Sequence, residues 1–323
     1  MLGTLRLALA LAVAAYHVGW RPGGVQMGGT AVVMFYIISG YAMSGLGRAL
    51  LAGPAGAGAL RFWRDRLLRL YPQYLFWLVL AAAVRFGTGR MWLFQHGPLG
   101  WSNALANLTI FPLSLYMYVP AWAQLMLIPP AWSLSTELGF YALFPLIWRS
   151  RTATWALALG GCCVLALAAT DILPAEWYSY RLLPGTLPFF LLGRAMFLRD
   201  RALLATLAAL FTAIAANAWA TGHQHTGFNT EIALALLLGP PAIALAVRIP
   251  PWRWDALCGH ASYGAYLAHI TLIVLGVREL PTLPARVAAI TLLSAAAGLL
   301  SYWLIERPVN RYRRRLRGRE PQS

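Results

Sequence analysis

About ten apolar stretches run through the chain, and they constrain its fold more than any other feature of the sequence. A membrane-spanning helix needs about 20 apolar residues, so ten of them would use roughly 200 of the 323 residues. We therefore expect an all-α, polytopic integral membrane protein with about ten transmembrane helices around a polar cavity. The stretches predict helices over residues 4–20, 28–47, 70–87, 131–149, 152–170, 182–198, 202–220, 230–247, 260–278 and 284–306.

The composition supports a single transmembrane domain. Hydrophobic residues make up 59% of the chain and charged residues only 11%, whereas a soluble domain carries about 25% charged residues. We expect this domain to cover residues 1–306 and to be followed by a basic cytoplasmic tail over residues 307–323.

The charge is strongly basic and comes from arginine alone. All 26 basic residues are arginines, and the net charge is +16. With the N-terminus in the cytoplasm, 20 arginines fall on the inner side of the predicted membrane and 6 on the outer side. This positive-inside distribution predicts a multi-pass protein of the cell inner (plasma) membrane with both termini cytoplasmic. The placement speaks against nucleic acid as a partner, and the basic tail favours contact with anionic membrane lipids.

The first apolar stretch carries Arg6 and His17 on one face of its predicted helix. His17 lies eleven positions after Arg6, which corresponds to about three turns and a rise of roughly 16 Å. A histidine at that depth is costly unless it faces the protein interior or a wet cavity. A secretory signal peptide with a cleavage site at residues 12–14 is an alternative, disfavoured by the many membrane stretches that follow. A catalytic histidine and one that only satisfies a hydrogen bond are equally supported by this stretch.

A cluster of arginines lies in the predicted cytoplasmic segment over residues 48–69. It contains two Arg-x-x-Arg spacings, each nearly one helical turn long, formed by Arg61 with Arg64 and by Arg66 with Arg69. Guanidinium groups form forks that suit phosphates, so this segment could hold a nucleotide-bearing cofactor that arrives from the cytosol. Ordinary positive-inside charge explains the same residues equally well.

Two predicted helices carry polar faces. An intramembrane carboxylate such as Glu137 is a functional-site hypothesis by default, whereas helix-to-helix hydrogen bonding explains the serines and tyrosines almost as well. Ser39-Gly40 in the second helix suits tight helix packing. The polar residues of both faces and Ser39 together indicate a polar cavity. Such a cavity suits transfer chemistry at an oxygen atom or transport, and neither function is strongly favoured. The faces consist of Ser133, Glu137 and Tyr141, and of Ser262, Tyr266 and His269.

Other polar features are interpreted as structural. Residues 88–130, rich in Trp, Tyr and Pro, predict an external segment with an interfacial or re-entrant helix. The His-x-His pair, His223 and His225, has no acid or cysteine nearby, and the three cysteines are typical of packing residues, so we expect no metal site. Pro308 is expected to close the last helix.

Six short motifs, in this order, resemble those of the integral membrane acyltransferase-3 family. Each motif is weak alone, but the ordered set extends from residue 5 to residue 308. The chain departs from the family pattern at Thr136 and Gly139, where members often carry a further acid and a glutamine. The motifs are LRLALALAVAAYH (5–17), FYIISGY (35–41), RFWRDRLLRLYP (61–72), WSLSTE (132–137), SYGAYLAH (262–269) and IERP (305–308).

The resemblance implies an O-acyltransferase that moves an acyl group, most often acetyl in the family, from acyl-CoA to an exported glycan or lipid-linked sugar. It implies that His17 is the general base or a transient acyl carrier, and that no metal takes part. Glu137 would orient a protonated imidazole or an arginine, and Arg6 would orient the donor or pair with a carboxylate. The remaining roles are CoA phosphate binding by Arg66 and Arg69 with help from Arg61 and Arg64, and acceptor contacts from Ser39, Ser133, Tyr266 and His269.

The alternative function is that of a flippase or transporter that moves an acyl or glycan lipid without forming a bond. Transporters of this size often show an internal repeat with paired broken helices. The two halves of this sequence show no convincing repeat, which favours the enzyme.

Overall fold

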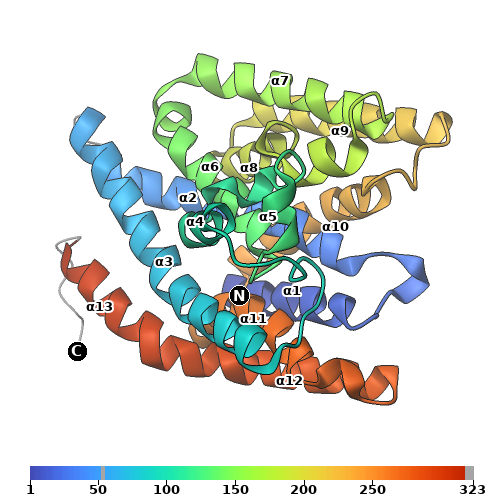
Figure 1. The fold of residues 1–323 in the computed structure, drawn as a ribbon. Helices are drawn as coiled ribbons and strands as arrows, with labels where there is room; N and C mark the ends of the chain where they lie inside the picture. Colours follow the sequence, from blue (N-terminus) through green and yellow to red (C-terminus); the bar gives the residue numbers. More distant parts are fainter. Residues whose placement is uncertain (52–54, 317–323) are drawn as a thin grey trace. The chain divides into compact units, whose positions relative to one another are not determined.

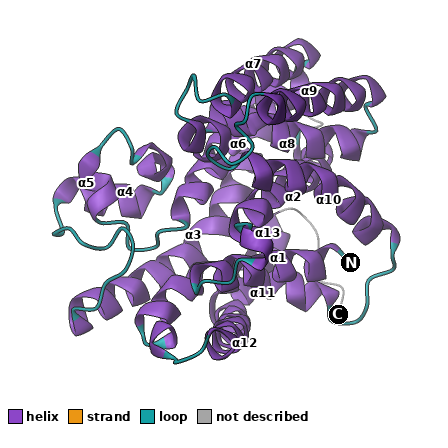
Figure 2. Cartoon of the chain, turned by 90° about the vertical axis from the view of Figure 1, so that its right-hand side faces the viewer, coloured by secondary structure: helices purple, strands orange, loops and turns teal. Residues whose placement is uncertain are grey.

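The computed structural model of the protein describes residues 1–51 and 55–316, and within these ranges it is helical without a strand (Figures 1 and 2). Short 3-10 or π-helical turns join several of the helices. The α-helices are α1 (Leu2–His17), α2 (Met27–Leu50), α3 (Ala55–Thr88), α4 (Trp101–Thr109), α5 (Pro120–Gln124), α6 (Ala131–Arg149), α7 (Arg151–Ala169), α8 (Leu183–Leu198), α9 (Arg201–Ala220), α10 (Asn229–Arg248), α11 (Asp255–Val274), α12 (Leu283–Ser301) and α13 (Arg307–Leu316).

The length and composition of these helices identify a membrane protein. Within the described ranges, 6 helical segments are long and apolar enough to cross a membrane. The expected all-α, multi-pass class is therefore confirmed, while the number of about ten crossings stays a prediction. The segments are Met27–Leu50, Gly56–Thr88, Arg151–Ala169, Arg201–Ala220, Asn229–Arg248 and Leu283–Arg313.

The chain forms two compact units, each assembled from separate parts of the sequence. The first unit combines Met1–Trp20, Trp63–Ala131 and Ala246–Ser323. The second unit combines Arg21–Phe62 and Trp132–Leu245.

In the first unit, α1 and α11 pack side by side and run in the same direction. Where both helices begin, the backbone N–H groups of Gly3 and Thr4 donate to the Asp255 carboxylate at 3.3 and 2.8 Å. Asp255 precedes the apolar part of α11. Burial would raise the pKa of its carboxyl, but the hydrogen bonds from Thr4 and Gly3 lower that pKa below its usual value. Fourteen residues further along each helix, His17 meets His269, so the Asp255 contacts help to set this register.

The last membrane helix, α12, packs against α11 in the opposite direction. At one end the two backbones come so close that a Cβ atom on Gly298 would overlap the Ala261 carbonyl. At the other end Ile290 belongs to an apolar cluster that includes Ile273 and Val277. The glycine contact therefore joins the start of α11 to the end of α12, and the cluster joins the end of α11 to the first half of α12.

In the second unit, α2 and α8 cross at very short range. A Cβ atom on Gly40 would overlap the Phe190 carbonyl, and one on Gly193 would overlap the Ile37 carbonyl. Beside this crossing, the rings of Tyr36 and Phe190 lie 4.7 Å apart. The expectation that Ser39-Gly40 permits tight helix packing is therefore confirmed at the glycine.

Two helix ends differ from the sequence prediction. α3 begins at Ala55, so most of the predicted cytoplasmic segment is helical and continuous with the third apolar stretch. An apolar run cannot reveal these turns, because they carry arginines. Pro308 does not close the last helix: a π-helical turn over Tyr302–Glu306 leads into α13, which continues to Leu316. Pro308 is the second residue of α13, where a missing N–H is tolerated.

Residues 88–130 contain only short helices. The longest, α4, has 9 residues and is therefore about 14 Å long, too short for a hydrocarbon core of about 30 Å. The external location of this segment and its interfacial or re-entrant helix stay predictions.

Candidate active site

The best-defined polar site of the first unit is a histidine pair, His17 at the end of α1 and His269 in α11. His17 Nδ1 lies 2.9 Å from the Val13 carbonyl oxygen and 3.2 Å from His269 Nε2. His269 Nδ1 lies 2.6 Å from the Tyr266 carbonyl oxygen. His269 is 0% exposed, whereas His17 is only half-buried. The pair therefore has one imidazole sealed in the core and one that is partly accessible.

The two carbonyl contacts determine where the imidazole protons lie. A carbonyl oxygen only accepts, so His269 Nδ1 carries a proton and Nε2 of the neutral ring carries the lone pair. That lone pair accepts the Nδ1–H of His17, which is shared with the Val13 carbonyl. On this assignment from hydrogen-bond partners, Nε2 is the proton-accepting nitrogen of His17.

Aromatic rings surround the histidine pair. The Tyr16 and Trp92 rings approach the His17 ring edge-on, with centroids 5.1 and 6.2 Å away. The Tyr266 hydroxyl, predicted to contact an acceptor, donates to the Pro130 carbonyl at 3.2 Å. Hydrogen bonds in such low-dielectric surroundings are stronger than in water, and buried polar groups without partners are costly.

Arg6 lies in α1, three turns before His17, and is half-buried. Both residues belong to the first unit, whereas Glu137 belongs to the second. The structure therefore describes the predicted catalytic residues as two separate sets.

The arginine segment of α3 is tied to α13 through the carboxylate of Asp65. Arg66 forms an ion pair with Asp65, and Arg313 pairs with the same carboxylate at 3.0 Å. All three side chains are buried. Removing one partner of such a buried pair leaves an uncompensated charge, which is strongly destabilising.

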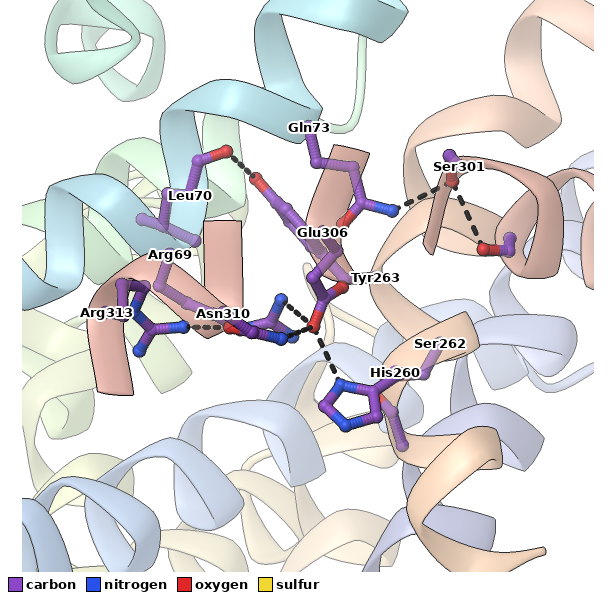
Figure 3. A network of polar contacts seen from close by, with 12 residues as sticks. Arg69, Leu70, Gln73, His260, Ser262, Tyr263, Ser301, Glu306, Asn310 and Arg313 are labelled. Carbon is purple, nitrogen blue, oxygen red and sulfur yellow. Dashed lines mark hydrogen bonds and ion pairs between the residues drawn. The ribbon is translucent and has the colours of Figure 1, made fainter. Parts of the chain in front are cut away.

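A second carboxylate, that of Glu306, holds Arg69 in the network shown in Figure 3. Glu306 Oε1 lies 2.6 Å from Arg69, 2.8 Å from His260 and 3.1 Å from the amide nitrogen of Asn310. The Asn310 side-chain oxygen accepts from Arg313 at 2.6 Å. Because Arg313 also binds the first carboxylate, the two ion-pair centres form one network between α3, α11 and the end of the chain that the structure describes.

The other two arginines of the segment are exposed. Arg61 donates from Nε to the Ala57 carbonyl at 3.2 Å, and Arg64 lies on the exposed side of α3. Arg61 belongs to the second unit and Arg64 to the first. The four predicted phosphate contacts thus divide into an exposed pair and a pair that buried acids hold in place.

In the second unit, hydroxyl groups hold the carboxylate of Glu137. Ser39 and Tyr141 donate to Glu137 Oε1 at 2.6 and 2.5 Å. The predicted face of α6 is confirmed for Glu137 and Tyr141, and Ser133, one turn earlier, is buried. Ser39 comes from α2, so this carboxylate links two helices of the unit.

Sequence reasoning missed three contacts of this site. It assigned no partner in α11 to His17, and it did not consider the Asp65 carboxylate, although Asp65 lies beside Arg66 in the sequence. It placed Glu306 beside Arg307, whereas Glu306 binds Arg69, and the Arg307 guanidinium lies 4.4 Å over the Trp303 ring. Only the adjacency of Asp65 and Arg66 offered a local signal.

The described ranges contain no group of three or more His, Cys, Asp or Glu side chains that could hold a metal ion. His223, in the loop between α9 and α10, contacts the Thr221 hydroxyl at 2.9 Å. The cysteines in these ranges are free.

Comparison with known proteins agrees with the resemblance. The exopolysaccharide production protein ExoZ of Rhizobium meliloti (strain 1021) is 25% identical over 316 residues, 88% of this chain and 90% of that protein. The acyltransferase MdmB of Streptomyces mycarofaciens is 27% identical over 128 residues, 38% of this chain and 29% of MdmB. An uncharacterized protein of Aquifex aeolicus (strain VF5) is 26% identical over 207 residues, 60% of this chain and 91% of that protein.

No solved structure shows a significant match to the chain. A family model described as an acyltransferase domain matches residues 2–306. Since this match covers nearly the whole sequence, the chain belongs to the acyltransferase-3 family, and the protein is a membrane acyltransferase.

Proposed function

We propose that this protein transfers an acyl group, with acetyl as the first candidate, from acyl-CoA to a hydroxyl group of an exported polysaccharide or lipid-linked sugar. The similarity to ExoZ over 88% of the chain supports a polysaccharide-related acceptor. The protein would act in the cell inner membrane with both termini in the cytoplasm, as its arginine distribution suggests. The transmembrane domain would cover residues 1–306 and the basic tail residues 307–323.

The observation that carries this proposal is the hydrogen bonding of His17. Because Nδ1 donates to the Val13 carbonyl and to His269, Nε2 is the ring nitrogen that can take a proton in general-base chemistry. In the proposed reaction Nε2 takes the proton of the acceptor hydroxyl. At the same time the oxygen of that hydroxyl attacks the carbonyl carbon of the thioester. The C–S bond then breaks, and the imidazolium returns the proton to the departing CoA thiolate.

The arginine segment would hold the phosphates of acyl-CoA. Arg66 and Arg69 would be the principal contacts, and Arg61 and Arg64 would assist. Guanidinium groups suit phosphates because of their forked geometry. The network supports this role, because the carboxylates of Asp65 and Glu306 gather three guanidinium groups, those of Arg66, Arg69 and Arg313.

The remaining residues would support the base and the acceptor. Glu137, held by two hydroxyl groups, would orient a protonated imidazole or an arginine, and Arg6 would orient the donor or pair with a carboxylate. Ser39, Ser133 and Tyr266 would contact the acceptor.

The sharpest test is the variant His17→Gln. Glutamine keeps a similar volume and a hydrogen bond but cannot take a proton, so acyl transfer should fall by about 10²–10⁴-fold. Transfer from acyl-CoA would be measured on purified protein in lipid, with thermal unfolding recorded alongside. His225→Ala, a change of an exposed histidine, serves as the control and should keep its activity.

Three outcomes can be distinguished. A stable, inactive His17→Gln variant that still binds acyl-CoA supports proton transfer at this position. Near-normal transfer by that variant would remove His17 from the chemistry. Failure of the wild-type protein to consume acyl-CoA with any hydroxyl acceptor would contradict the proposed reaction itself.

A further inference from the structure

We infer that His269 is a positioning residue for the reaction: its Nε2 lone pair holds the Nδ1–H of His17 and stabilises the imidazolium that forms during transfer. This inference rests on the proposed function, because it assigns a partner to the proposed base. It changes the role of His269 from acceptor contact to a group that acts through His17.

The position of the proton on His269 is imposed by its own helix. His269 is 0% exposed, so bulk water does not reach its ring nitrogens. Its Nδ1 lies 2.6 Å from the Tyr266 carbonyl, a contact that is attractive only with the proton on Nδ1. Nε2 of the neutral ring is therefore an acceptor, and it lies 3.2 Å from His17 Nδ1.

In the proposed reaction His17 passes from a neutral to a positively charged ring. In the resting state the Nδ1–H of His17 is shared by two acceptors, the Val13 carbonyl and His269. When Nε2 takes a proton, the ring becomes positive and both hydrogen bonds become charge-assisted, roughly twice as strong as neutral ones. The Val13 carbonyl alone would orient the ring, but the second acceptor adds stabilisation of the charged form.

The aromatic surroundings of the pair increase the contribution of the His269 lone pair. The rings of Tyr16 and Trp92 lie against His17, and the ring of Tyr266 lies against His269. Aromatic rings solvate a developing imidazolium less well than water does, so the His269 lone pair carries more of that stabilisation. The parallel packing of α1 and α11, tied by Thr4 and Asp255 at 2.8 Å, holds the two imidazoles together.

A structural role alone would also produce a hydrogen bond between α1 and α11. The two roles differ in what they predict for His17. A packing histidine can be replaced by any side chain that fills its volume, whereas a positioning histidine requires an acceptor at the place of Nε2. Replacements of His269 with and without an acceptor at this place therefore distinguish the two roles.

The first experiment reads the proton positions without turnover. Nitrogen-15 NMR of histidine-labelled protein in lipid, with the His17 signals identified by their loss in His17→Gln, should give a protonated Nδ1 and an unprotonated Nε2 for both His17 and His269. A protonated Nε2 on His269 would overturn the inference. Because no substrate is involved, this result is independent of whether the proposed function holds.

The second experiment compares two replacements of His269. His269→Phe keeps a ring but removes the acceptor, whereas His269→Gln keeps an acceptor without a titrating group. We expect kcat to fall about 10–10²-fold in His269→Phe with KM for acyl-CoA unchanged, and the acidic limb of the pH profile, where protonation of His17 stops transfer, to move to lower pH. His269→Gln should recover most of kcat.

The outcomes of this comparison separate the two roles. A lower kcat with a shifted pH profile in the phenylalanine variant, and recovery in the glutamine variant, supports the positioning role. Equal activities of the two variants, with an unmoved pH profile, would overturn it. If His269→Phe does not fold, the nitrogen-15 spectra of the wild type still decide the question, because they report directly whether His269 Nε2 is an acceptor.

Discussion

At the scale of single residues, the two buried acids change how the arginine segment has to be tested. Arg66 and Arg69 each pair with a carboxylate, Asp65 and Glu306. Truncating one partner of a buried pair leaves the other charge unpaired and costs about 3–5 kcal/mol. A simple alanine variant therefore loses stability whether or not the arginine binds a phosphate.

A double replacement separates the two effects. Arg69→Ala should weaken acyl-CoA binding by about 1.5–3 kcal/mol and also lower the unfolding temperature. Arg69→Gln combined with Glu306→Gln removes both charges, so it should recover most of the stability while acyl-CoA binding stays weak. Arg69→Lys should rescue binding only in part, because a point charge cannot reproduce the guanidinium fork.

The measurements are thermal unfolding in detergent and calorimetric titration with acyl-CoA. Arg64→Ala is the matched control for stability, since Arg64 is exposed on the same helix and its loss should leave the unfolding temperature almost unchanged. Normal acyl-CoA affinity in the double variant would show that Arg69 has only a structural role.

At the scale of secondary-structure elements, the close crossing of α2 and α8 offers the clearest prediction. Gly40→Ala should destabilise the protein by about 1–3 kcal/mol, because the added methyl group would overlap the Phe190 carbonyl and the helices must separate. Gly45→Ala in the same helix should be neutral or stabilising. Its Cβ would lie 3.5 Å from the Phe197 ring, and alanine favours a helix over glycine by about 1 kcal/mol.

Both variants make the same chemical change in α2, so thermal unfolding in detergent compares only the local packing. Equal unfolding temperatures for Gly40→Ala and Gly45→Ala would mean that the crossing tolerates a wider spacing than the structure has.

At the scale of the whole molecule, helix direction supports the proposed topology. The predicted first and ninth crossings should run the same way and the tenth the opposite way. Within the first unit, α1 and α11 are parallel and α12 is antiparallel. α13 exposes Arg307, Arg311 and Arg315 at a spacing of four residues, which suits anionic lipid head groups on the side of the membrane where the tail is predicted to lie.

Cysteine labelling tests this topology. In a background without Cys162, Cys163 and Cys258, a membrane-impermeant maleimide should label His225→Cys in intact cells. The same reagent should label Arg311→Cys only after the cells are permeabilised. Both positions are exposed, so a difference reports the side of the membrane rather than burial. Labelling of Arg311→Cys in intact cells would contradict cytoplasmic placement of the tail.

Much of the fold was predictable from the sequence. The apolar stretches matched helices α1, α2 and α6–α12 within a few residues at most ends, because a membrane segment must satisfy its backbone hydrogen bonds internally and so becomes helical wherever it is apolar enough. Hydropathy did not predict the helical turns at the start of α3 or those after Glu306. These turns are charged and lie outside the apolar stretches.

The sequence by itself determined the fold class, the helical face that Arg6 and His17 share, and the family, because these depend on local spacing and on ordered motifs. Only the tertiary structure decided that His17 meets His269, 252 residues away in the chain. It also decided that Arg69 forms an ion pair with Glu306. Spacing along a helix specifies which side chains share a face. Which faces meet depends on packing between helices, and contacts such as that between Gly298 and Ala261 decide it.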